Sequence, residues 1–139
     1  METHITDIAH VIQLSVAPVF LLTAISTLIG AMNTRLGRII DRRRVVTDAR
    51  QHQEMTQADK EEFCLLDRRR RLIYFAILFA VMAALLVCFV VAGAFLGALI
   101  ATDLTRLVAA LFILAMGSMI AALSLFLREI YLAVSAGSR

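Results

Sequence analysis

Four consecutive arginines, Arg68–Arg71, have the clearest chemical capacity in this sequence, because guanidinium groups bind phosphates and carboxylates. They could contact a polyanion such as nucleic acid, or they could mark the edge of a membrane. An apolar segment adjoins them directly at Leu72, and no base-reading or stacking residues accompany them. We therefore expect a membrane edge, where anionic lipid headgroups attract each charge by about 1 kcal/mol, and no nucleic-acid partner. Arg35 and Arg38 are assigned to the same edge.

The other reactive residue types do not form a recognisable constellation. Cys64 lies in a charged block and Cys88 in an apolar one, with no C-x-x-C or Cys/His spacing. His10 is expected at a membrane interface, and the sequence has no Ser/His/Asp set, glycine-rich phosphate loop or H-E-x-x-H motif. The sequence therefore predicts a non-enzymatic protein with no catalytic, cofactor-binding or metal-binding residues.

Three long uncharged segments make up most of the rest of the sequence and must form the elements that hold any functional residues in place. They cover residues of about 8–33, 72–101 and 107–127, in a chain that is 60% hydrophobic and contains one proline. About 20 apolar residues are enough for a helix to cross the hydrocarbon of a bilayer, where each backbone polar group must be paired within the segment. We predict an all-α polytopic membrane protein with a single membrane domain over residues 1–139. The short link after Ala101 makes the second and third spans antiparallel neighbours.

The charge distribution predicts the orientation. Residues 35–71 hold 11 of the 14 Lys and Arg residues, and short basic loops remain in the cytoplasm. The N-terminus, with Glu2 and Asp7, is then expected outside and the C-terminus inside.

The charged block is predicted to be a cytoplasmic helical hairpin formed by extensions of the first and second spans, with its turn near residues 52–55. Thr56 and Asp59 have the spacing of a capping box at the start of the second helix. A turn centred near residue 54 would place Arg42 beside Asp67 and Asp41 beside Arg68, in exposed ion pairs worth about 0–1 kcal/mol each. The alternative is a solvated charged face without cross-pairs.

Small and polar residues form a stripe on one face of the first span. They could let helices pack closely, or line a narrow aqueous path in an oligomer. The stripe comprises Gln13, Thr23, Ser26, Thr27, Gly30, Asn33 and Thr34. Packing motifs of the other spans are Gly93-x-x-x-Gly97 and Gly117-x-x-x-Ala121. Three helices offer few ways to bury all these faces within one protomer, so we expect a homo-oligomer.

Two functional hypotheses follow. In the first, the homo-oligomer has a pore or ion-channel-like role, with the stripe lining the path. In the second, the protein is a membrane scaffold or accessory subunit whose hairpin docks an unknown protein partner. In both, anionic headgroups at the cytoplasmic edge are the expected lipid partner.

Three stretches together resemble a known family: Ala17–Arg44, Arg68–Val91 and Leu125–Ala133. Their order and spacing are similar to domain of unknown function 2721, a family of small bacterial membrane proteins, and the most specific pieces are Asn33–Leu36 and Leu127–Ile130. The resemblance covers nearly the whole chain. It implies a bacterial inner-membrane location and a three-span layout, and it supplies no activity or catalytic residues.

Overall fold

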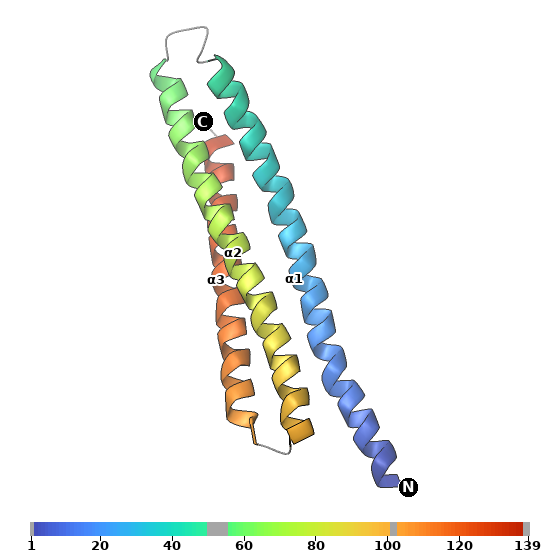
Figure 1. The fold of residues 1–139 in the computed structure, drawn as a ribbon. Coiled ribbons are helices and arrows are strands. Elements are labelled where there is room, and N and C mark those ends of the chain that lie inside the picture. The colour runs from blue at the N-terminus through green and yellow to red at the C-terminus, as the bar shows by residue number, and fades with distance from the viewer. Residues whose placement is uncertain (1, 50–55, 101–102, 138–139) are drawn as a thin grey trace.

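The computed structural model describes residues 2–49, 56–100 and 103–137, and all of its regular structure is helical (Figure 1). The helices are α1 (Glu2–Ala49), α2 (Gln57–Ile100) and α3 (Thr105–Gly137). The described residues contain no strand, so the prediction of an all-α chain is confirmed. The first span continues as one helix into the charged block, as predicted, and Pro18 lies inside it.

Local hydrogen bonds explain where α2 and α3 begin. The Thr56 backbone N–H donates to the Asp59 carboxylate at 3.1 Å, which is one half of the predicted capping box. At α3, the Thr105 backbone N–H donates to the Asp103 carboxylate at 3.1 Å. Hydrogen bonds from Thr105 lower the pKa of Asp103. The predicted turn at residues 52–55 lies outside the described residues.

α2 is the central helix of the bundle, and α1 and α3 both pack against it. α3 runs antiparallel beside α2, as predicted, while the N-terminal part of α1 diverges from that pair (Figure 1). The buried residues recur every seven positions on each helix. On α1 they are Ile25, Met32 and Ile39, on α2 Leu66, Ile73, Ala80 and Val87, and on α3 Ala115, Ala122 and Glu129. A seven-residue repeat keeps one seam facing its partners along the bundle, as in a coiled coil.

Alanines let α2 and α3 approach closely. Ala80 and Ala83 of α2 are fully buried in one cluster with Ala115 and Ala122 of α3. Small side chains at such a contact favour helix association in a membrane. The Ser118 hydroxyl adds a hydrogen bond to the Phe79 carbonyl at 2.8 Å, across the same pair of helices.

Apart from the polar face of α1, the outer surface of the bundle along the uncharged segments is largely apolar, as expected for contact with lipid. Large hydrophobic side chains such as Phe20, Leu99 and Ile113 are more than two-thirds exposed. Each of the three helices is long and apolar enough to cross a membrane, with candidate segments within Val16–Asp48, Gln57–Gly97 and Thr105–Ser135. The chain therefore has the helices of a membrane protein, with three candidate spans.

The alanine contact can be tested by overpacking. Replacing buried Ala122 with leucine should lower the free energy of unfolding by about 1–3 kcal/mol, because inserted methyl groups force the two helices apart. Ala110→Leu on the exposed face of α3 is the matched control and should have little effect. Unfolding in detergent micelles measures both changes, and equal effects of the two substitutions would refute the α2–α3 seam.

Candidate functional site

Glu129 is the fully buried charged residue of the bundle. Its side chain has no exposed surface, while every other buried residue described is hydrophobic. The seven-residue repeat explains its position, because Glu129 follows Ala115 and Ala122 on the seam of α3. A carboxylate is thus placed where an apolar side chain would complete the core, and burying it requires strong partners.

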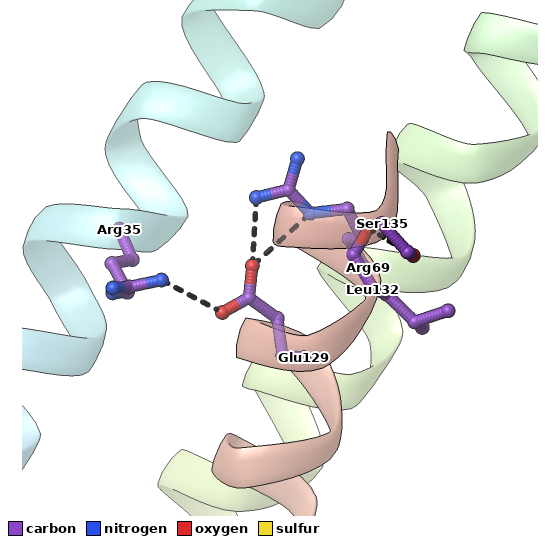
Figure 2. A network of polar contacts seen from close by, with 5 residues as sticks. All are labelled: Arg35, Arg69, Glu129, Leu132 and Ser135. Carbon is purple, nitrogen blue, oxygen red and sulfur yellow. Dashed lines mark hydrogen bonds and ion pairs between the residues drawn. The ribbon is translucent and has the colours of Figure 1, made fainter. Parts of the chain in front are cut away.

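Two arginines from the other helices provide those partners (Figure 2). Arg69 of α2 donates from Nη2 and Nε to Glu129 Oε1, at 2.8 and 3.1 Å. Arg35 of α1 donates from Nη1 to Glu129 Oε2 at 3.3 Å. Each carboxylate oxygen is therefore bound by a different helix. We call Arg35, Arg69 and Glu129 the charge triad.

The charge triad also joins α1 to α3, which otherwise touch little because both pack mainly on α2. The Arg35 guanidinium contacts α3 a second time, lying 5.5 Å from the centre of the Phe126 ring. This is cation–π distance, and Phe126 precedes Glu129 by about one helical turn. Arg35 therefore fixes both the separation and the register of α1 against α3.

The charge triad lies at the same end of all three uncharged segments. Arg35 directly follows the last uncharged residues of the first segment, Arg69 precedes Leu72, and Glu129 follows Leu127. Charged groups at this depth can be partly hydrated, and the Arg35 and Arg69 side chains are 42% and 22% exposed. The charge triad thus closes the apolar seam at the end of the uncharged segments.

The remaining arginines of this edge have other roles. Arg68 and Arg71 are exposed, as expected of residues that face headgroups and water. Asp67 contacts Arg70 at 3.5 Å and Arg71 at 3.4 Å, one turn along its own helix. The six arginines assigned to the edge are therefore not equivalent, because Arg35 and Arg69 turn inward.

The hairpin ion pairs differ from those predicted. Arg42 contacts Glu62 at 2.8 Å in place of Asp67, and Asp67 contacts Arg43 at 3.8 Å. Asp41 and Arg68 form no ion pair with each other. The prediction counted residues from the turn and ignored the 100° rotation between successive helix positions. Arg42 and Arg43 therefore point to opposite sides of the α1–α2 seam and meet different acids.

The polar stripe of α1 points away from the other two helices. All of its seven members are exposed, whereas Ile25 and Met32 on the opposite face are buried. The hydroxyls of Thr23, Thr27 and Thr34 donate to carbonyls one turn earlier at 3.0 Å. Because these side chains are exposed, their hydroxyl oxygens can still accept a hydrogen bond from a neighbouring molecule.

The two predicted small-residue motifs differ in their surroundings, because Gly93 lies in the α2–α3 contact and Gly117 lies on the outer surface of the bundle. A Cβ atom added at Gly93 would lie 3.3 Å from the Val108 side chain, so Gly93 permits close α2–α3 packing, and Gly97 is half-buried. Gly117 is exposed and an added Cβ would meet nothing within 4 Å, while Ala121 is half-buried. A packing role for Gly117 therefore needs a neighbouring molecule.

Glu129 was not among the predicted site residues, although it lies within the family-specific stretch Leu127–Ile130. The signal was present in its seven-residue spacing from Ala115 and Ala122, which places it on a buried seam. No comparable signal chose Arg69 and Arg35 from the neighbouring arginines. Among the described residues, no group of three His, Cys, Asp or Glu side chains could hold a metal ion.

Removing the Glu129 charge should destabilise the bundle. Glu129→Ala leaves two guanidinium groups without their acceptor, and breaking a buried ion pair in this way costs about 3–5 kcal/mol. Because both arginines are partly exposed, we expect a loss near the lower end, about 3 kcal/mol.

The paired substitution distinguishes charge balance from packing. Arg69→Met with Glu129→Met removes the buried pair together and should recover most of the lost stability. Arg128→Gln, next to Glu129 but exposed, is the matched control. Unfolding in detergent micelles measures the double variant, its two single variants and the control, and strictly additive effects of Arg69→Met and Glu129→Met would contradict the coupling.

Comparison with known protein families gives a match over most of the chain. The sequence model of the family described as "Protein of unknown function (DUF2721)" matches residues 15–138, nearly the whole chain. No significant match is found among curated proteins or solved structures. The matched region includes all three members of the charge triad. The chain belongs to the DUF2721 family of proteins of unknown function.

Proposed function

We propose that this chain is a non-enzymatic protein of the bacterial inner membrane whose copies associate through α1 and form a pore or channel-like assembly. The observation that carries the proposal is the exposure of the whole polar stripe on the face of α1 opposite the buried seam. Polar side chains are unfavourable against lipid, so this face is best explained by contact with another copy or with water.

The chemistry of the stripe suits a narrow aqueous path. Its threonine hydroxyls are already bonded to their own helix, so they offer acceptor oxygens without leaving a donor unsatisfied. Gly30 leaves open space on the same face, with nothing within 4 Å of an added Cβ. The path would reach the basic edge near Thr34, where arginines form the mouth and favour anions.

The proposed orientation puts the charge triad and the hairpin in the cytoplasm, in accord with the basic block of residues 35–71. With Cys88→Ala, exposed Cys64 in the α2 part of the hairpin is the remaining cysteine. A membrane-impermeant maleimide should label Cys64 in spheroplasts only after the membrane is permeabilised. Asp103→Cys without the native cysteines is the control and should be labelled from outside, and the reverse pattern would overturn the orientation.

A specific observation supports the second candidate, a scaffold or accessory subunit. α1 and α2 continue past the charge triad as a pair, held by the Arg42–Glu62 contact and by Arg43 over the Phe63 ring at 4.9 Å. This projecting pair could dock a protein partner while the spans serve as an anchor. A stoichiometric partner that is lost on deletion of the hairpin, with no conduction, would favour this candidate.

The pore proposal can be tested at Thr27. In a chain lacking Cys64 and Cys88, Thr27→Cys should form disulfides between copies, or should bind a thiol reagent that reduces ion conduction in planar bilayers several-fold. The physical reason is that a bulky adduct would obstruct a path lined by this face of α1.

The matched control is Ile120→Cys, at a comparable distance from the charge triad on α3 and 65% exposed to the surroundings. It should carry the same reagent without changing conduction. Purified protein that passes no ion of either sign over a range of voltages would refute the pore role. Thr27→Cys that neither forms a cross-link between copies nor changes conduction with the thiol reagent would refute association through α1.

A further inference from the structure

A groove of about 270 Å³ lies between α1 and α2 beside the charge triad. Its wall is unusual because four of its six residues carry a guanidinium group, and the other two are aliphatic. The lining residues are Arg35, Arg38, Ile39, Arg42, Leu66 and Arg69.

The charge of this groove is not balanced within the described chain. Glu129 forms ion pairs with both Arg35 and Arg69, and Glu62 forms an ion pair with Arg42. Arg38 has no ion-pair partner among the described residues. Four guanidinium groups thus share two carboxylates, which leaves an excess of two positive charges along the wall of the groove. A bound anion would offset this excess.

The guanidinium groups still have donors to offer. Arg35 uses Nη1 for Glu129, so its Nε and Nη2 groups remain for another acceptor. Arg69 uses Nε and Nη2, which leaves Nη1. Arginine forks match the oxygens of a phosphate group well, and several forks from two helices can bind one phosphate together.

We propose that this groove binds the phosphate of one anionic phospholipid per chain. A lipid is favoured over a free phosphate because the groove lies where the uncharged segments end, at the depth of headgroups, and because Ile39 and Leu66 give it an apolar floor. The bound phosphate would be a second anionic partner, besides Glu129, for the arginines of the groove. The site depends on the membrane boundary at this level and not on the conduction proposed above.

Arg38 gives the sharpest test, because it lines the groove without belonging to the charge triad. Native mass spectrometry of the purified chain, titrated with phosphatidylglycerol or phosphatidylcholine in detergent micelles, counts the lipids retained on each protein. We expect one retained phosphatidylglycerol and little phosphatidylcholine. Arg38→Gln should weaken retention about tenfold, the effect of losing a charged hydrogen-bond donor.

The matched controls are Arg68→Gln and Arg128→Gln, which remove exposed arginines that do not line the groove. Both should retain phosphatidylglycerol nearly as well as the unmodified chain. Equal losses for all three variants would show only a diffuse basic edge and would overturn the site. Displacement of the lipid by millimolar inorganic phosphate would instead assign the groove to free phosphate, and equal retention of phosphatidylcholine would show that its charge is not recognised.

Discussion

The ionic contact of Glu129 with Arg35 and Arg69 constrains the whole arrangement of helices. A carboxylate without solvent exposure must be paired, and its two oxygens are paired with different helices. Because Arg35 comes from α1 and Arg69 from α2, α3 can take only one register against both. The apolar contacts below this layer are made largely by alanines and aliphatic side chains, which allow neighbouring registers more readily. The charge triad therefore specifies which register is used.

The charge triad also lies at the level where the apolar part of the bundle meets its charged part. On the apolar side of it, the seam consists of buried hydrophobic side chains and the outer surface carries large exposed hydrophobic residues. On the other side, α1 and α2 continue as a charged pair with cross-helix contacts. An excess of arginine over carboxylate at this level suits the proposed phospholipid site, and the outward polar stripe of α1 suits association of copies. Both proposals thus arise from surfaces that one protomer leaves open.

Much of the fold could be predicted from the sequence, because the length and spacing of apolar segments act locally. The three helices, the antiparallel α2–α3 pair and the Thr56–Asp59 cap all follow from short-range patterns. The charge triad could not be predicted in the same way. Choosing Arg69 from four consecutive arginines requires the rotation of α2 about its axis, which only tertiary packing fixes. The error in the Arg42 pair has the same origin, since Arg42 and Arg43 face opposite sides of one seam.

The central claim is that one buried carboxylate binds two arginines in the membrane-embedded bundle. Solid-state NMR of the chain in phospholipid vesicles can measure it directly, through dipolar coupling between the Glu129 carboxylate carbon and guanidinium nitrogens. We predict coupling to two guanidinium groups, one of which disappears in Arg35→Gln and the other in Arg69→Gln. A Glu129 carboxylate that couples to no guanidinium group in the vesicles would contradict the account.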